Sequence, residues 1–178
     1  MGITQDQYRY TKKGWGSFLK MYLTNPCFRF VVFLRASSHF SRFNPLGLIA
    51  RIFLHINKSS YGIQIPHITK IGKGLFIGHY GAIVVSNEAV IGDNCNLAQG
   101  STIGRINKGP RKGAPKIGNR VWIGANAVLV GNISIGDNVL IAPLSFVNFD
   151  VPANSMVLGN PAQIIEGKTS EDYINFHF

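Results

Sequence analysis

Residues 114–147 read APKIGNRVWIGANAVLVGNISIGDNVLIAPLSFV, and an aliphatic residue returns at every sixth position of this segment. Two earlier runs have the same spacing, and a small residue often follows the aliphatic one. The aliphatic positions are Ile65, Ile71, Ile77 and Ile83, then Ile91, Leu97 and Ile103, then Ile117, Ile123, Leu129, Ile135, Ile141 and Val147. A helix repeats every 3.6 residues and a strand every 2, so neither produces this period by itself.

A period of six predicts short flat strands separated by sharp turns. Three such faces close one coil of a triangular prism, with the aliphatic side chain inside and the small residue where the chain bends. Successive coils pair as parallel strands, and each coil buries the apolar side of its neighbours. The sequence therefore predicts a mainly β solenoid.

Two interruptions break this spacing. The step from Ile83 to Ile91 is two residues too long, and the step from Ile103 to Ile117 is fourteen residues. Residues 104–116, GRINKGPRKGAPK, are basic and rich in glycine and proline, so we expect them to leave the prism as a loop. Such a loop either carries function or is a tolerated insertion.

The first 60 residues differ from the rest in charge. They hold nine Lys and Arg against one acid, Asp6, while the whole chain of 178 residues has a net charge of +10. Apolar residues at helical spacing predict helices over 15–23 and 28–40, with a third apolar segment over 46–56. This basic, aromatic region suits a core helix with snorkelling arginines, a helix on an anionic membrane surface, or packing between subunits. No nucleic-acid-binding motif accompanies the charge, so we expect no nucleic-acid partner.

Several classes of protein are disfavoured by the remaining features. Cys27 and Cys95 lie too far apart for a metal motif or a disulfide framework, which favours free buried thiols. The amino terminus lacks the apolar core of a secretory signal, and no apolar run is long enough to span a membrane. We therefore expect a cytoplasmic protein, held at the inner face of the membrane if the basic region binds lipid.

Three motifs carry a resemblance to a known family. They are KIGKGLFIGHYGAIVV at 70–85, AVIGDNCNLAQGSTIG at 89–104 and VPANSMVLGNPAQII at 151–165, together with the segment quoted first. The chain resembles the hexapeptide-repeat acyltransferases, and most closely the serine acetyltransferases and their relatives that modify capsule and exopolysaccharide. The resemblance implies a left-handed parallel β-helix over 61–165 with an extruded loop at 104–116, a helical region over 1–60 and a C-terminal tail over 166–178.

The resemblance also implies the chemistry. Such enzymes transfer acetyl from acetyl-CoA to a hydroxyl without a metal, as homotrimers or pairs of trimers with the active site between adjacent prisms. It places the catalytic base at His79, an orienting group at Gln64, where the family has an aspartate, and an oxyanion-stabilising backbone N–H at Gly104. The residues implied for binding CoA are Gly104, Lys108, Ala125, Ala142, Pro143, Gly159 and Pro161, with Arg111, Lys112 and Lys116 as further basic candidates.

The acceptor is predicted from departures from that pattern. Gly78 replaces a family aspartate, and Gly113 and Ala114 replace an arginine–histidine pair, so the groups that would bind the ammonium and carboxylate of serine are missing. The sequence thus favours a neutral acceptor, a sugar hydroxyl of a surface polysaccharide or its precursor. Serine O-acetylation is the alternative, and a non-catalytic β-helix scaffold is the second. A zinc-dependent carbonic anhydrase of similar shape needs three histidine ligands per site, and the repeat region supplies only His67 and His79.

Overall fold

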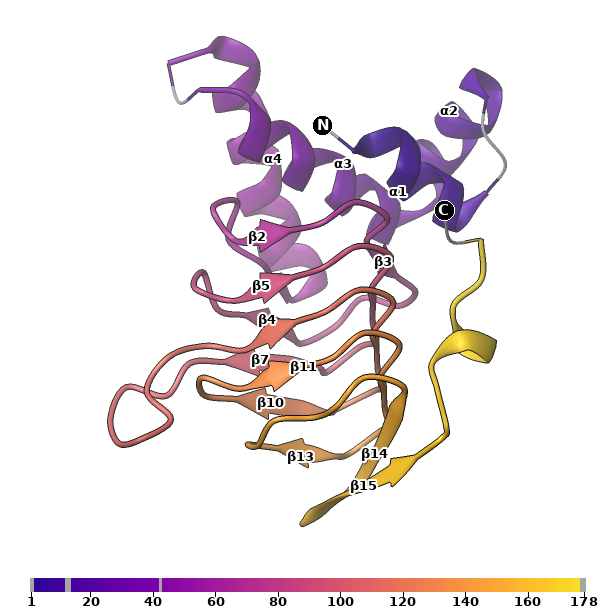
Figure 1. The fold of residues 1–178 in the computed structure, drawn as a ribbon. Coiled ribbons are helices and arrows are strands. Elements are labelled where there is room, and N and C mark those ends of the chain that lie inside the picture. The colour runs from indigo at the N-terminus through magenta and orange to yellow at the C-terminus, as the bar shows by residue number, and fades with distance from the viewer. Residues whose placement is uncertain (1, 12–13, 42, 177–178) are drawn as a thin grey trace.

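The computed structural model describes residues 2–11, 14–41 and 43–176. Four helices come first, and all lie at one end of a long stack of strands (Figure 1). They are α1 (Ile3–Tyr10), α2 (Trp15–Thr24), α3 (Pro26–His39) and α4 (Pro45–Tyr61). Lys12, Lys13 and Arg42, which contribute to the basic charge, lie outside the described residues, as does His177.

Capping residues fix where helices α3 and α4 begin and where α4 ends. The Asn25 side chain accepts a hydrogen bond from the Phe28 N–H at 2.9 Å, and Asn44 caps α4 in the same way through the Leu46 N–H at 2.9 Å. A proline follows each asparagine, where its missing N–H costs nothing. Gly62 ends α4 in the left-handed conformation, at a φ of 65°, and the chain then enters the first strand.

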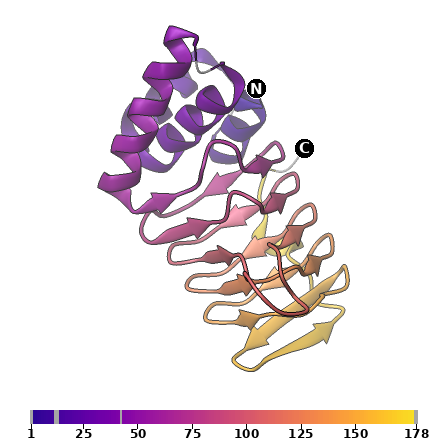
Figure 2. The ribbon, with the colours of Figure 1, turned by 90° about the vertical axis from the view of Figure 1, so that its left-hand side faces the viewer.

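Three sheets form the prism, and the coils stack below the helices (Figure 2). Neighbouring strands are parallel throughout, except in the final hairpin. The first sheet holds β1 (Ile63–Gln64), β4 (Ile83–Val85), β7 (Thr102–Gly104), β10 (Val128–Val130) and β13 (Phe146–Val147). The second holds β2 (Lys70–Ile71), β5 (Val90–Ile91), β8 (Lys116–Ile117) and β11 (Ser134–Ile135). The third holds β3 (Phe76–Ile77), β6 (Asn96–Leu97), β9 (Trp122–Ile123), β12 (Leu140–Ile141), β14 (Ser155–Gly159) and β15 (Ala162–Glu166).

The sixfold aliphatic residues form the core, as the period predicts. In the third sheet Ile77 pairs with Leu97, Leu97 with Ile123, and Ile123 with Ile141, and all four are buried. Each such side chain contributes about 1.5–3 kcal/mol when removed from water. The prediction of a mainly β prism with a helical N-terminal region is confirmed.

The corners of the prism exclude side chains. A Cβ at Gly92 would lie 2.5 Å from the carbonyl oxygen of Gly118 in the next coil, and one at Gly118 would lie 2.4 Å from Oδ1 of Asp137. The small residues that follow the aliphatic anchors are therefore a condition of close coil stacking.

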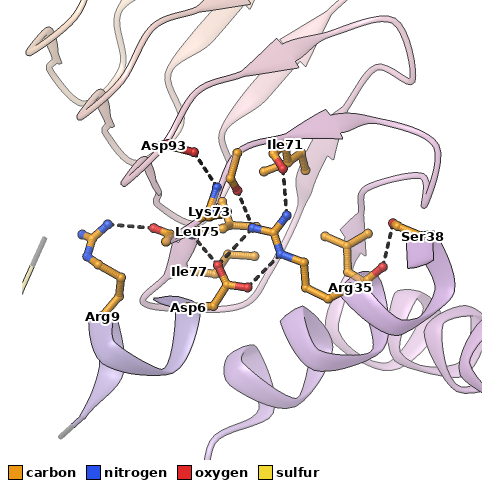
Figure 3. Close-up of polar contacts among 12 residues, drawn as sticks. Asp6, Arg9, Arg35, Ser38, Ile71, Lys73, Leu75, Ile77 and Asp93 are labelled. Atoms are coloured by element: carbon orange, nitrogen blue, oxygen red, sulfur yellow. Dashed lines mark hydrogen bonds and ion pairs between the residues drawn. The ribbon is translucent and has the colours of Figure 1, made fainter. Parts of the chain in front are cut away.

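A buried ion pair joins the helices to the prism (Figure 3). The Arg35 guanidinium donates to Oδ2 of Asp6 at 2.7 Å and to Oδ1 at 3.0 Å, and it also donates to the carbonyls of Ile71 and Gly72. Asp6 in turn accepts from the Leu75 N–H at 2.9 Å. Burial raises the pKa of Asp6, and the Arg35 guanidinium opposes that shift. Loss of either charge would leave the other buried without an opposite charge.

Helix α1, which the sequence analysis did not predict, carries two more of these connections. Arg9 donates to the Gly74 carbonyl at 2.8 Å and to Oδ1 of Asn96 at 2.6 Å. The Tyr10 hydroxyl accepts from the Ile77 N–H at 2.8 Å and donates to the Ile77 carbonyl at 3.1 Å. β3 is the edge strand of the third sheet, so Ile77 has no neighbouring strand on one side. The Tyr10 hydroxyl therefore takes the place of that strand as the hydrogen-bond partner of the Ile77 N–H and carbonyl.

The C-terminal segment closes the far end of the prism and then returns to the helices. β15 folds back antiparallel on β14, and the chain runs up the side of the prism through a short 3₁₀ helix (Glu171–Tyr173) (Figure 1). Ser170 donates to the Arg120 carbonyl, and Arg9 donates to the Asn175 carbonyl at 3.0 Å. The expected tail is thus fixed against the prism over its described part.

Three smaller observations complete the fold. Cys27 and Cys95 are free and buried, and burial raises the pKa of their thiols to about 11 and about 12. None of the described helices combines the length and the continuous apolar sequence that a membrane span requires. Nor do the described His, Cys, Asp and Glu side chains form a group of three that could hold a metal ion.

The corner constraint yields a first prediction. Gly92→Ala should lower the free energy of unfolding by about 1–3 kcal/mol, because the added methyl meets backbone that cannot move independently. Gly16→Ala is the matched control, since nothing lies within 4 Å of its Cβ and alanine favours the helix. Urea unfolding followed by circular dichroism measures both variants. Equal stability of Gly92→Ala and the parent chain would contradict the constraint.

Candidate active site

His79 lies at a corner of the prism. It follows β3, where the chain turns from the third sheet toward β4 in the first, and its side chain is exposed. His79 borders a pocket of about 340 Å³, which is also lined by Phe76, Asn96, Leu97, Trp122 and Tyr173. The exposed imidazole is accessible to a substrate.

Strand register places several other predicted residues along the same corner. Ile77, Leu97, Ile123, Ile141 and Val157 are aligned in successive coils. Two residues further on in each coil stand His79, Gln99, Ala125, Pro143 and Gly159, which we call the corner column. Coils are about 4.8 Å apart, so the column extends roughly 19 Å along the prism.

Ala142 and Pro161 lie beside the corner column. Ala142 immediately precedes Pro143, and its N–H donates to the Val157 carbonyl at 2.8 Å. Pro161 follows Gly159 in the turn between β14 and β15, after a cis peptide bond at Asn160. Five of the residues predicted to bind CoA therefore share one edge of the prism with the predicted base.

Gln64 stands apart from His79. It lies in β1 and borders a different pocket, together with Leu54, His55 and Lys58 of α4. Among the described residues, neither the Gln64 nor the His79 side chain makes a hydrogen bond. Glu88, the acid nearest to His79 in the sequence, forms an ion pair with Arg105. Within one chain, the orienting role predicted for Gln64 has no geometric support.

The basic loop leaves from another corner. Gly104 ends β7 in the first sheet, and the chain re-enters the prism at β8 in the second sheet. Ile106 and Gly113 form a bridge across the base of the loop, and Lys108 is exposed beyond it. Gly104 and Lys108 are thus on a different edge from the corner column of the same chain.

One ion pair ties this loop to the coil that lies two further along the prism. Arg111 donates to Oδ2 of Asp150 at 2.9 Å, and Oδ1 of Asp150 accepts from the Ser134 N–H at 2.7 Å. The Arg111 hydrogen bond, with that of Ser134, holds the pKa of Asp150 below its usual value. The contact therefore stabilises the loop at neutral pH and weakens as pH falls through the lowered pKa of Asp150.

Three residues of the site escaped the sequence analysis. Gln99 is in the corner column directly next to His79, and only strand register could reveal it. Trp122 and Tyr173 pack together near His79, with ring centroids 5.3 Å apart. Tyr173 comes from the C-terminal segment, which has no repeat to predict where it packs.

The pocket beside His79 is neutral. Its described lining contains no carboxylate, ammonium or guanidinium group, and Gly78 forms part of it. Gly113 and Ala114 lie at the base of the loop, where neither provides a polar side chain. The absence of the charged groups expected for serine binding is thus a property of the described pocket as well as of the sequence.

Comparisons with known proteins agree with this geometry. Residues 114–148 match the family described as bacterial transferase hexapeptide (six repeats). The chain is 35% identical over 147 residues to the serine acetyltransferase of Synechococcus elongatus, covering 83% of this chain and 60% of that protein. It is 41% identical over 117 residues to the serine acetyltransferase of Staphylococcus aureus, covering 66% of this chain and 55% of that protein.

Solved structures give the same result. The soybean serine acetyltransferase apoenzyme superposes with a TM-score of 0.77 at 28% identity, over 92% of this chain and 67% of that one. The Brucella abortus serine acetyltransferase in complex with coenzyme A has a TM-score of 0.76 at 28% identity, over 93% of this chain and 66% of that one. The chain contains hexapeptide repeats and shares its fold with these serine acetyltransferases.

These matches confirm the left-handed parallel β-helix expected for this hexapeptide-repeat protein. They also bear on the acceptor, because the relatives described above are named for serine. They back serine O-acetylation, the alternative prediction, better than polysaccharide acetylation. The hexapeptide-repeat protein spans 55–60% of the length of the two curated relatives.

A second prediction concerns the basic loop. Asp150→Asn should loosen residues 104–116 of the hexapeptide-repeat protein, because Arg111 loses its ion pair and Ser134 keeps only a neutral acceptor. Trypsin should then cut after Arg105, Lys108, Arg111 or Lys112 several-fold faster. Glu166→Gln is the control, since that exposed acid makes no ion pair in the described chain. Unchanged cleavage in Asp150→Asn would show that the ion pair does not hold the loop.

Proposed function

We propose that this chain transfers an acetyl group from acetyl-CoA to a hydroxyl, with His79 as general base. The observation that carries the proposal is the exposed imidazole at the head of the corner column, next to a neutral pocket. The similarity to serine acetyltransferases, one of them solved with coenzyme A, supports the same reaction.

The reaction requires a base near the acceptor. An alcohol is a weak nucleophile at neutral pH, and histidine suits removal of its proton during attack on the thioester carbonyl. The hydroxyl oxygen forms the new ester bond, the C–S bond breaks, and the proton held by the imidazole passes to the departing thiolate. A backbone N–H directed at the carbonyl oxygen would stabilise the negative charge that develops there, the role we assign to Gly104.

The corner column suits a long, thin cofactor. Ala125, Pro143 and Gly159 are half-buried or exposed and have small side chains or none, so backbone groups are accessible along this edge, whereas Ala142 is buried behind it. We propose that the pantetheine arm of CoA lies against it, near Pro161 at the far end, with its thioester beside His79. Lys108 and Lys112 are exposed basic residues that form no ion pair in the described structure, so they are available for the phosphates.

A complete site requires a second copy of the chain. The corner column and the basic loop occupy different edges of one prism, so one chain does not bring Gly104 and Lys108 to its own His79. Side-by-side packing of prisms would bring the loop of one copy to the column of the next. This geometry supports the expected homotrimer, and Gln64 of a neighbouring copy could then orient the imidazole.

Two acceptors remain candidates. The names of the relatives favour serine. The neutral, aromatic lining of the pocket favours an uncharged hydroxyl such as that of a sugar, because a buried zwitterion needs partners of both signs. A non-catalytic scaffold would bind neither acetyl-CoA nor acceptor.

A third prediction tests the base. His79→Ala should lower kcat for CoA release from acetyl-CoA by about 10²–10⁴-fold, since the attacking hydroxyl loses its proton acceptor. The KM for acetyl-CoA should change little, because the rest of the column is intact. His39→Ala, which removes an exposed imidazole on α3, is the control. Full activity of His79→Ala would eliminate it as the base, and absence of acetyl-CoA turnover in the parent chain would favour a scaffold.

A fourth prediction separates the acceptors. If serine is bound without recognition of its charges, its neutral derivative N-acetylserine amide should have a kcat/KM within about tenfold of that of serine. Sugars and oligosaccharides tested in the same thiol-release assay show whether a neutral hydroxyl is preferred. A preference for free serine of a hundredfold or more would mean that charged groups from a neighbouring chain complete the pocket.

A further inference from the structure

Helix α4 turns its larger apolar side chains toward solvent. The face packed against the protein consists of Gly47, Ala50, Leu54 and Asn57. The rest of the helix surface exposes six large aliphatic or aromatic side chains, each between 44% and 58% accessible: Leu46, Leu48, Ile49, Ile52, Phe53 and Ile56. A helix that only covered a core would have the reverse arrangement.

Helix α2 extends the same pattern. None of its ten residues is buried. Trp15, Leu19 and Leu23 are exposed at 79%, 48% and 63%, and their spacing of four places them on one side of the helix. A helix this short is marginal in water unless it packs against something, so α2 has an apolar side in need of a partner.

A series of aromatic contacts joins the two helices into one surface. Trp15 stacks on Phe18 and Phe18 on Tyr22, while Tyr22 meets Phe33 of α3 and Phe33 stacks on Phe53 of α4. The centroid distances along this series are 5.6, 6.2, 6.1 and 4.9 Å. We call the exposed residues on either side of it the helical apolar face: Trp15, Leu19, Leu23, Ile49, Ile52, Phe53 and Ile56.

The charge around this face has one sign. Residues 7–87 contain eleven Lys and Arg and no Asp or Glu. The single acid before them, Asp6, is fully buried against Arg35 and contributes no negative charge to the surface. Lys20 and Lys58 are exposed on α2 and α4 themselves. The helical end therefore combines apolar side chains with exposed lysines, and no acid in residues 7–87 balances their charge.

We propose that the helical apolar face docks on the surface of an anionic lipid bilayer. Apolar side chains with a tryptophan, flanked by lysines, suit the boundary between headgroups and acyl chains. A second copy of the chain is the poorer occupant, because two such faces would bring positive charge against positive charge. The helices lie together at one end of the prism, so the rest of the molecule projects away from the lipid (Figure 1, Figure 2). The proposal does not depend on the reaction at His79.

Flotation with vesicles tests the proposal on the full chain. Vesicles of phosphatidylcholine with 30% phosphatidylglycerol, about a third of the lipid, should carry the protein, and phosphatidylcholine alone should carry at least tenfold less. Added salt should weaken the binding. The double variant Ile49→Asp with Ile52→Asp should reduce binding at least tenfold, and Lys20→Glu with Lys58→Glu should also reduce it. Ile164→Asp and Lys168→Glu make the same changes on exposed residues of the C-terminal part, and both should bind as the parent chain does.

Tryptophan fluorescence locates the contact. Trp122→Phe leaves Trp15 as the single reporter, and its emission should shift to the blue on adding anionic vesicles. Trp15→Phe leaves Trp122 in the prism, which should not respond. Absence of vesicle binding would overturn the proposal. So would a smaller assembly for the double aspartate variant in analytical ultracentrifugation, because a second copy would then cover the face.

Discussion

Close stacking of the coils depends on glycines at the corners of the prism, where a Cβ atom would collide with the next coil. A Cβ at Gly124 would lie 2.6 Å from the Pro143 nitrogen, and one at Gly136 would lie 2.4 Å from the Ala153 nitrogen. Because these positions are bare, successive coils approach to strand-pairing distance and their aliphatic residues align in the core. The residues just after each strand are aligned between coils in the same way. His79, Ala125 and Pro143 therefore lie in a row along one edge of the prism. The core and the candidate site therefore follow from a single geometric constraint.

The prism could be predicted from the sequence because its signal is local and repeated. Each six-residue repeat contains one aliphatic residue that marks its inward position. Aligning these residues, such as Ile77 with Leu97 and Ile123, gives the register between strands. No repeated pattern in the sequence indicates the contacts that α1 makes. Asp6 and Tyr10 meet partners about 30 to 70 positions away, and nothing near them in sequence indicates Arg35 or Ile77.

The candidate site was predictable in part for the same reason. His79 and the small residues of the corner column belong to motifs in the repeat, and they lie where the repeat places them. Gln64 was transferred by resemblance, and within one chain it borders a pocket with α4 instead. Tyr173 reaches the pocket by a long return of the C-terminal segment, which no periodicity describes. Residues contributed by another copy are beyond any pattern in one chain.

The two proposals place the acceptor and the cofactor on different sides of the site. The corner column runs from His79, in the coils nearer the helices, to Gly159 at the far end. A lipid surface at the helical end would therefore lie closer to the acceptor pocket than to the nucleotide part of CoA. An acceptor attached to lipid and a cofactor drawn from solution would then approach the site from opposite ends.

The antiparallel return of β15 has a consequence for assembly. A stack of parallel strands presents hydrogen-bonding groups at each end, and an identical stack could continue it as a fibre. Here the helices cover one end, and β15 reverses direction on the other, with its side chains mostly exposed. Continuation of the strands along the long axis is thereby hindered at the helical end and, in the third sheet, at the other end. Side-by-side packing of whole prisms uses none of these strand ends.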